Sequence, residues 1–413
     1  MEGRSTRGVG INFSTNNNSV VLSGEGDTLI KGSSVADTGV AISGVVNNGT
    51  GPVTIEGTSR DNIGVHLFSA EHQVNRINVT GSSTHADGLR ISGNATITDA
   101  TLTGASINGS GVKIDPLPGS NIVTHVVLDN ATLTGSSTNG IGVEVANDIK
   151  GIHQSVINGT TNGTGYGIEI AANLHVTGTS ETDLLTLNGV ATTDIGTGIK
   201  LNGNNDLSNT SLNGSAVDGI ALDITSSSAN QGNTVFKGTA SGSGIGVQIN
   251  GLLDGGVVNG AATSGTGVQV IDGVLDNSRI NGLSDAGSGV SVNGDTVLNN
   301  TVLVGNSTDG KVVEIVGRLS GGYGSSVQGD VVNGIGMYID RNATLTGGDS
   351  GELLVISCNA TGEKGTGVQM ESNNTLDNTM LNGNATQGTG VDITGPLVNN
   401  GNTRVVGIAT GGN

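Results

Sequence analysis

The feature that most constrains this chain is a repeated phrase. The segment GTGVQVIDGVLDNSRING begins at Gly265 and GTGVQMESNNTLDNTMLNG begins at Gly365, with valine, leucine and asparagine at matched places. Both belong to an imperfect repeat, in which a glycine followed by an aliphatic residue recurs mostly every 21 to 27 residues and three times after 31, with a degenerate position near Lys311. A period in this range is typical of a solenoid. The repeat glycines are Gly39, Gly64, Gly88, Gly111, Gly142, Gly167, Gly198, Gly219, Gly246, Gly267, Gly289, Gly336, Gly367 and Gly390.

The apolar residues within one unit are spaced as in short β-strands. Two of them come first, two residues apart, so both point to one face of a strand, and further leucines follow after short polar gaps. No long window has apolar residues at helical spacing, which excludes helical and leucine-rich repeats. We therefore expect three short strands per unit around one interior. Two such sets are Ile199, Leu201, Leu207, Leu212 and Ala216, and Val368, Met370, Leu376, Leu381 and Ala385.

A single unit would expose its inner face and its strand edges, whereas stacked units bury a continuous aliphatic column. The sequence therefore predicts an all-β fold, a parallel β-helix (β-solenoid) of about 16 coils of 21–31 residues, filling residues 1–413 as a single repeat domain. Because parallel crossovers are almost always right-handed, we expect a right-handed helix.

Asparagine-glycine pairs close the predicted third strand in many units. Both residues adopt positive φ easily, so we expect these pairs to form the sharp corners of the coils. They are Asn108-Gly109, Asn158-Gly159, Asn188-Gly189, Asn213-Gly214, Asn259-Gly260, Asn281-Gly282 and Asn382-Gly383.

Composition limits the partners and the kind of core. The chain has no Trp, three Tyr and three Phe among 413 residues, so its interior must be narrow and aliphatic. The net charge of -19 opposes binding to nucleic acid and to anionic membranes. No apolar run is long enough to span a bilayer, so we expect no direct membrane insertion of this segment. The lone cysteine, Cys358, fits a buried strand position.

A search for reactive residues gives little. Asp87, Asp218 and Asp309 each precede a glycine, where aspartate is an ordinary turn former, and the coil alignment predicts no second carboxylate or basic residue beside them. The six histidines lack the paired spacing of zinc sites. The nearest approach to a ligand pair, His66 and His72, is more simply explained as two exposed loop histidines. We predict no catalytic, cofactor-binding or metal-binding residue, no cofactor and no enzymatic activity, and we assign no binding residue.

The longer units carry extra residues that we expect to form loops. Loops on a rigid scaffold often carry binding sites, although a surface loop with no binding role is the simpler interpretation of each one. The three candidates are Asp115 to His125, Asn173 to Asp183 and Arg341 to Glu352.

Repeats rich in Gly, Asn, Thr and Val, such as GTGVDITGPLVNNGNT from Gly388 to Thr403, run through nearly the whole chain. In these repeats, in its single cysteine and in its few aromatic residues, the chain resembles the passenger regions of type V secreted bacterial adhesins. These are the autotransporter and filamentous-haemagglutinin-like families. The resemblance implies export, folding into a right-handed β-helix outside the cell, and location at the bacterial cell surface or in the extracellular space. The family's signal, β-barrel translocator and asparagine-proline motif do not occur, so we expect an internal segment of a longer passenger and leave the secretion branch open.

Three functions follow as hypotheses. The first is a cell-surface adhesin, whose partner is a host-cell receptor, the extracellular matrix, a glycan or identical rods on neighbouring cells. The second is a structural stalk that presents a distal effector domain. The third is a polysaccharide-acting β-helix enzyme or a tailspike segment. Two or three carboxylates on one face of adjacent coils would be evidence for this function.

Overall fold

The structure is a computed structural model that describes residues 1–13, 20–22, 24–43, 45–47, 49–119, 124–193, 195–322, 324–348 and 352–411, without the side chains of 45–47, 72, 230 and 231. The described residues form strands and no helix, which confirms the all-β prediction. The chain contacts divide it into two compact units, Met1–Gly214 and Ser215–Asn413. Each unit is described by itself, and the single domain expected from the repeat stays a prediction.

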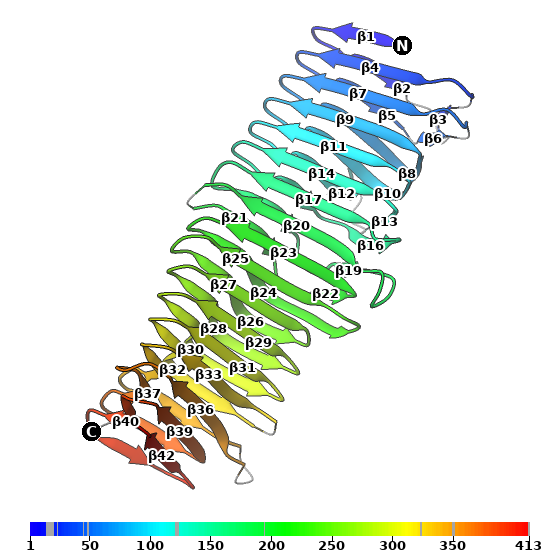
Figure 1. The fold of residues 1–413 in the computed structure, drawn as a ribbon. Coiled ribbons are helices and arrows are strands. Elements are labelled where there is room, and N and C mark those ends of the chain that lie inside the picture. The colour runs from blue at the N-terminus through cyan, green and yellow to red at the C-terminus, as the bar shows by residue number, and fades with distance from the viewer. Residues whose placement is uncertain are drawn as a thin grey trace. The chain divides into compact units, whose positions relative to one another are not determined.

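The first unit is a parallel β-solenoid whose coils alternate between two sheets. Equivalent strands of successive coils pair in parallel, as in β11 with β14 and β14 with β17 (Figure 1). Sheet A contains β1 (Glu2–Ser5), β4 (Thr28–Ser34), β7 (Val53–Ser59), β9 (Ile77–Ser83), β11 (Thr101–Ser106), β14 (Thr132–Ser137), β17 (Val156–Thr161), β20 (Leu185–Ala191) and β23 (Thr210–Ala216), which crosses the unit boundary. Sheet B contains β2 (Ile11–Phe13), β5 (Val40–Ile42), β8 (Val65–Asn75), β10 (Leu89–Thr98), β12 (Val112–Asp115), β13 (His125–Asp129), β15 (Val143–Val145), β16 (Asp148–Ile152), β18 (Tyr166–Ile170), β19 (His175–Thr177), β21 (Thr197–Leu201) and β22 (Asn205–Ser208).

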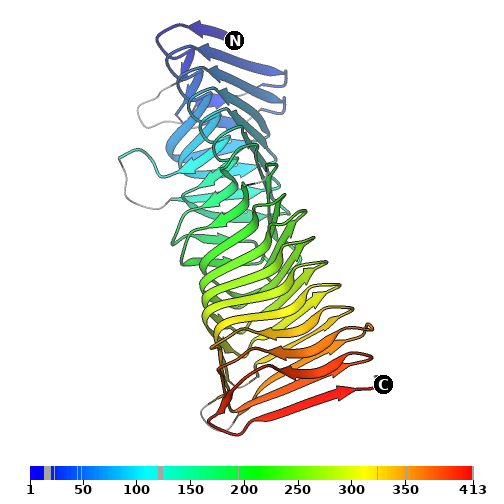
Figure 2. The ribbon, with the colours of Figure 1, turned by 90° about the vertical axis from the view of Figure 1, so that its left-hand side faces the viewer.

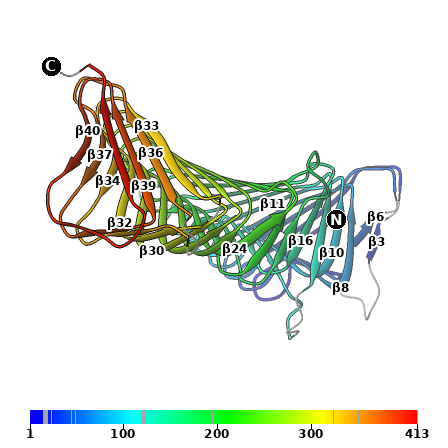
Figure 3. The same cartoon turned by 90° about the horizontal axis from the view of Figure 1, so that it is seen from below.

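One short ribbon lies outside these two sheets. Strands β3 (Val20–Leu22) and β6 (Val45–Asn47) pair in parallel with each other, and Figure 3 shows them side by side. Together they form a separate two-stranded sheet near the start of the chain.

The second unit repeats the same arrangement, and Figure 2 shows its coils stacked from green to red. Its part of sheet A contains β25 (Val235–Ala240), β27 (Val257–Ala262), β29 (Arg279–Ser284), β31 (Val302–Ser307), β33 (Ser326–Val331), β36 (Leu354–Ala360), β39 (Thr379–Ala385) and β42 (Arg404–Ala409). Its part of sheet B contains β24 (Ile220–Gln231), β26 (Ile245–Asp254), β28 (Thr266–Asp276), β30 (Ser288–Asn299), β32 (Lys311–Gly321), β34 (Ile335–Ile339), β35 (Thr344–Thr346), β37 (Thr366–Met370), β38 (Asn374–Asp377), β40 (Thr389–Ile393) and β41 (Leu397–Asn399). Seventeen sheet A strands in all agree with the predicted number of about 16 coils. The right-handed twist of the coil stays a prediction.

The core is the aliphatic column expected from the repeat. All ten apolar residues of the two sets chosen from the sequence are at most 3% exposed, and Cys358 is fully buried among them in β36. At the degenerate repeat position near Lys311, Val312 replaces the usual glycine and is also fully buried. Because each inward side chain stacks on its equivalent in the next coil, the core is narrow and almost wholly aliphatic. Among the described residues, Phe236 in β25 is the one aromatic side chain that is fully buried in it.

The number of strands per coil differs between parts of the chain. The predicted three strands occur where β37, β38 and β39 follow one another, but β26, β28 and β30 each join the first two strands of a coil into one. The register shifts within each joined strand, close to the positive-φ residues Gly251, Asp272 and Gly294. A bulge with one positive-φ residue bends a strand without ending it. The sequence did not predict these bulges, because glycine and aspartate are frequent throughout the repeat.

The corner position predicted for the asparagine-glycine pairs was wrong for six of the seven, and none of the seven has positive φ. Only Asn108-Gly109 lies in a bend, directly after β11, whereas Asn158-Gly159, for example, lies inside β17. The glycine points inward, where a Cβ on Gly159 would overlap the carbonyl oxygen of Gly167 on the facing strand. Glycine is therefore required by the close approach of the two sheets rather than by a turn.

Five of the corners before sheet A strands are formed by other asparagines. These residues adopt a left-handed conformation, which asparagine tolerates better than most residues. Their φ angles lie between 45 and 51°. They are Asn130, Asn209, Asn277, Asn300 and Asn378.

Candidate binding surfaces

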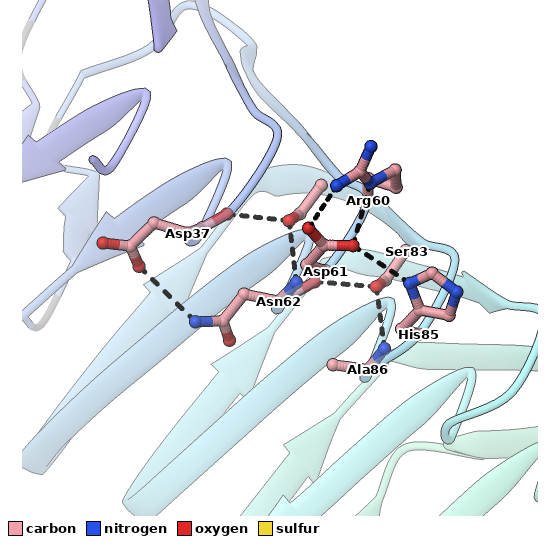
Figure 4. A network of polar contacts seen from close by, with 8 residues as sticks. Asp37, Arg60, Asp61, Asn62, Ser83, His85 and Ala86 are labelled. Carbon is pink, nitrogen blue, oxygen red and sulfur yellow. Dashed lines mark hydrogen bonds and ion pairs between the residues drawn. The ribbon is translucent and has the colours of Figure 1, made fainter. Parts of the chain in front are cut away.

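The far margin of sheet A carries a repeated hydroxyl. At the end of β7, Ser59 Oγ donates to the carbonyl oxygen of Asp37 in the preceding coil (2.7 Å) and accepts from the amide of Asn62 (3.0 Å). At the end of β9, Ser83 makes the same two bonds, with the Asn62 carbonyl and the Ala86 amide (Figure 4). This arrangement turns the chain and links neighbouring coils. It recurs at Ser106, Ser137, Thr161, Ser284 and Ser307.

A shallow groove follows this margin in the first unit. Its volume is about 410 Å³, and small side chains form its walls. Ser136 and Thr138 are exposed in it, and Ile107 is the one large aliphatic residue among its lining residues. We call it the margin groove. It is lined by Ser59, Ser82, Ser83, Thr84, Ala105, Ser106, Ile107, Ser136, Ser137, Thr138 and Asn162.

The second unit has a margin groove at the same repeat position. It has a volume of about 590 Å³ and begins where β36 and β39 end, as the first groove does at β11 and β14. Asn384 donates to Asn359 (2.8 Å), which donates to Asp330 (2.8 Å), so stacked amides form one wall. Thr361 and Thr386 are exposed beside them. Since the groove recurs in separate units, it is a property of the repeat.

An ion cluster lies next to the margin groove of the first unit. Arg60 contacts both carboxylate oxygens of Asp61 at 2.7 and 2.8 Å, and His85 Nδ1 lies 3.1 Å from Asp61 Oδ1 (Figure 4). The hydrogen bond from Arg60 is the main reason why the pKa of Asp61 falls to about 2. The cluster is exposed, so its pairing is screened by water and adds little stability.

Histidines and aspartates alternate on the outer face of sheet B in the first unit. The strand registers align His125, Asp148, His175 and Asp206 in four successive coils. The Nδ1 atoms of His125 and His175 each lie 3.2 Å from an oxygen of the aspartate in the next coil. The histidines appear singly in the sequence, and only the stacking of coils of unequal length brings them beside carboxylates.

A third concave site adjoins this column. Its volume is about 370 Å³, and Glu71, Asn94 and His125 form one wall in successive coils. The amide oxygen of Asn94 accepts a hydrogen bond from the backbone amide of His125 (2.8 Å). His125 is the last residue of the first range expected to form a loop, but it begins strand β13, so strand residues line this cavity. Gln73, Ala95, Thr96 and Val127 complete its lining.

The other predicted loops are only partly loops. Strand β19 occupies part of the range Asn173 to Asp183. Only a tight turn leaves the sheet, and in it the Asp183 amide donates to Ser180 O (3.0 Å). Strand β35 likewise occupies part of the range Arg341 to Glu352. Residues 120–123 and 349–351 lie outside the described part of the chain.

The three turn aspartates lie in turns, as expected. Asp218 accepts from the amide and hydroxyl of Ser243 (2.6 and 3.0 Å), and Asp309 accepts from Asn333 Nδ2 (3.1 Å). These bonds tie each turn to the next coil. They explain Asp218 and Asp309 without a catalytic role.

The surroundings of Asp87 correct the prediction that no charged partner lies beside it. Ser110 donates from its amide to Asp87 (3.2 Å) and from its hydroxyl to Glu144 (2.7 Å), while Lys113 Nζ lies 2.6 Å from Glu144. Partial burial raises the pKa of Asp87, and Arg90 is close enough to oppose that rise. The alignment missed this group because strand registers, rather than sequence intervals, decide which residues stack.

The prediction that His66 and His72 lie in a loop was also wrong. His66 and His72 both lie in strand β8 rather than in a loop, and the side chain of His72 lies outside the described part. His66 Nε2 lies 3.0 Å from Ser92 Oγ, and Ser92 donates to the buried Asp115 (2.7 Å). Arg90 forms an ion pair with the same Asp115, so this carboxylate is held from two sides.

Among the described residues, no three histidine, cysteine, aspartate or glutamate side chains are grouped so that they could hold a metal ion. Within the same residues, no helix has the length and apolarity needed to cross a membrane. Comparison of the chain with family models, with curated proteins and with solved structures gave no match.

Proposed function

We propose that the chain is a passenger segment of a bacterial cell-surface adhesin, which mediates adhesion to host cells or self-association. The observation that carries this proposal is the margin groove, which recurs in both units and presents hydroxyl and amide groups beside one exposed isoleucine, Ile107 in the first unit and Ile408 in the second. The sequence resemblance to type V secreted adhesins supports the same proposal and implies the cell-surface location.

The groove chemistry favours an extended, uncharged, polar partner such as a glycan chain. Hydroxyl and amide groups repeat at the coil spacing of about 4.8 Å, so a partner lying along the coil axis would meet the same groups in each coil. One such hydrogen bond adds only about 0.5 to 1.5 kcal/mol, and firm attachment requires contact over many coils. A repeated shallow groove provides that contact better than one deep pocket.

The test uses beads coated with the full chain and scored for attachment to host cells and to a panel of uncharged glycans. The paired changes Ser136→Arg/Thr138→Arg and Asn384→Arg/Thr386→Arg fill the two margin grooves, and Asn250→Arg changes an exposed residue outside them. We expect the groove variants to lose attachment and the control to keep it. Equal attachment by all variants would remove the groove from the proposal, and no attachment by the parent would favour the stalk.

One observation favours a second candidate, the polysaccharide-acting enzyme or tailspike segment. Asp87 in the turn before β10, Asp115 in β12 and Glu144 in β15 come from adjacent coils and lie close to Arg90 and Lys113. A carboxyl with a raised pKa can serve as a general acid. The test is release of reducing ends from neutral and acidic polysaccharides by the parent chain and by Asp87→Asn. Activity that is lost in the variant would establish the enzyme over the adhesin.

A further inference from the structure

The cavity beside His125 has no part in the functions proposed above. Its volume of about 370 Å³ lies within the usual range of small-molecule sites. Three successive coils form it, through strands β8, β10 and β13 on the outer face of sheet B. We call it the sheet B cavity. Its lining residues are Glu71, Gln73, Asn94, Ala95, Thr96, His125 and Val127.

One unpaired carboxylate gives the sheet B cavity its charge. Glu71 is exposed, and its carboxylate forms no hydrogen bond or ion pair with any residue that the structure describes. The carboxylate of Asp148, next to His125, already has two partners. Its Oδ1 accepts from the backbone amide of His175 (2.8 Å), and its Oδ2 lies 3.2 Å from His125 Nδ1. A ligand in the cavity therefore meets one free negative charge, at the β8 end.

The other polar groups of the cavity suit hydroxyls. Asn94 Oδ1 accepts from the backbone amide of His125 (2.8 Å), which leaves the Nδ2 donor of Asn94 for a ligand. The side chains of Gln73 and Thr96 are exposed and have no hydrogen-bond partner within the described part of the chain. Because His125 Nδ1 faces a carboxylate, this nitrogen carries the proton, and the neutral ring offers Nε2 as an acceptor. The lining thus provides both donors and acceptors, which a sugar ring with several hydroxyls can satisfy together.

We propose that the sheet B cavity binds a hexosamine with a free, protonated amino group. The ammonium group pairs with Glu71, the ring hydroxyls bond to the uncharged polar groups, and a C–H face of the ring packs on Ala95 and Val127. The amine lies at the β8 end, because Lys150 follows Val127 in the coil beyond the opposite end and repels a cation there. An N-acetylated sugar has no charge to offer and leaves the carboxylate without a partner, which weakens binding. The inference does not rest on the margin groove, whose chemistry favours an uncharged partner.

The experiment is a ligand-observed NMR titration of the full chain with glucosamine, N-acetylglucosamine and spermidine. We expect glucosamine to bind most tightly, because N-acetylglucosamine lacks the positive charge and spermidine lacks ring hydroxyls. Glu71→Gln should weaken glucosamine binding on the order of tenfold, as expected when one hydrogen bond to a charged group is lost. Glu363→Gln is the matched control, since Glu363 is an exposed glutamate in the second unit and does not line the cavity.

A second variant tests the sugar ring separately from the amine. Thr96→Val keeps a β-branched residue in strand β10 but removes its hydroxyl. Glucosamine binding should therefore weaken severalfold, whereas spermidine binding should not change. The same amine occurs on free hexosamines and on de-N-acetylated polysaccharides, so a glucosamine oligomer is titrated as well. Tighter binding of the oligomer would identify a polysaccharide as the source, and equal binding would identify the free sugar.

Three results would overturn the proposal. One is a parent chain that does not bind glucosamine. Another is equal affinity of the parent for glucosamine and N-acetylglucosamine, or equal affinity of the parent and Glu71→Gln for glucosamine. The third is spermidine that binds as tightly as glucosamine, which would make the cavity a site for amines in general. Slow labelling of the buried Cys358 thiol reports whether each variant is folded. The groove variant Ser136→Arg/Thr138→Arg should bind glucosamine as the parent does, so failure of the adhesin proposal would leave this inference standing.

Discussion

Gly282 in β29 faces Gly289 at the start of β30 so closely that a Cβ on Gly282 would overlap the carbonyl oxygen of Gly289. The same relationship joins Gly159 to Gly167 and Gly383 to Gly390. It explains why glycine recurs in the middle of sheet A strands, where its flexibility would otherwise be a disadvantage. The close contact of the two sheets at this edge keeps the aliphatic core narrow.

The first prediction concerns this contact. Gly282→Ala should lower the free energy of unfolding by about 1 to 3 kcal/mol or more, because the backbones must separate to admit the methyl group. Gly322→Ala is the control, since a Cβ there meets nothing within 4 Å. Urea unfolding followed by circular dichroism compares the two. Equal midpoints for both variants would show that the close approach is not required.

The second prediction concerns the amide ladder of sheet A. Asn188 donates to Asn158 (2.9 Å) and accepts from Asn213 (3.0 Å). Asn188→Ala removes both hydrogen bonds and should cost about 1 to 2 kcal/mol of unfolding free energy. Asn78→Ala, in strand β9, is the control, because Asn78 is exposed and makes no side-chain hydrogen bond with a described residue. The ladder has no stabilising role if both variants unfold at the same urea concentration.

The third prediction concerns pH. Asp129 lies 2.5 Å from His153 Nδ1, and this hydrogen bond raises the pKa of His153 above its ordinary value of 6.5. The pair therefore stabilises the folded chain fully below pH 6.5, and the contribution is lost as the pH rises through the higher folded-state pKa. The urea concentration at the unfolding midpoint should be measured below pH 6.5 and above the folded-state pKa of His153. The difference between these two midpoints should be larger for the parent than for His153→Gln. An identical pH dependence in both would contradict the assignment.

The fourth prediction concerns the only thiol. Burial raises the pKa of Cys358 to about 12, so the reactive thiolate is scarce and inaccessible in the folded chain. A thiol reagent should react with the native protein far more slowly than with protein in denaturant. Labelling at the same rate in both conditions would show that β36 is not packed into the core.

The fifth prediction concerns a buried hydroxyl. Thr296 is 1% exposed, and its Oγ1 has no hydrogen-bond partner among the described residues. Thr296→Val should therefore raise the free energy of unfolding by about 1 kcal/mol. Thr301→Val is the counterpart, because Thr301 Oγ1 donates to Leu275 O and Asn299 O, at 2.8 and 2.9 Å, and its loss should destabilise. A loss of stability in both variants would refute the prediction.

Much of the fold was predictable because it depends on the sequence period. The spacing of Ile199, Leu201 and Leu207 is enough to show which side chains share one interior, since alternation along a strand fixes the face. Stacking then follows, because a single coil cannot cover its own aliphatic face. The sequence alone thus determined a parallel β-solenoid and its core, while the adhesin function and the handedness stay predictions.

Only the tertiary structure decided what lies together on the surface. His125 and Asp148 are 23 positions apart in the sequence, whereas other neighbours in the coils are separated by 31, as in Asn374 and Ala343. Since coil length varies, sequence distance does not give the register, and the His–Asp column and the Asp87 group were both missed. The role of the asparagine-glycine pairs was misread for a related reason. A glycine required by close approach and one required by a turn have the same sequence signal, and only the position of the facing strand separates them.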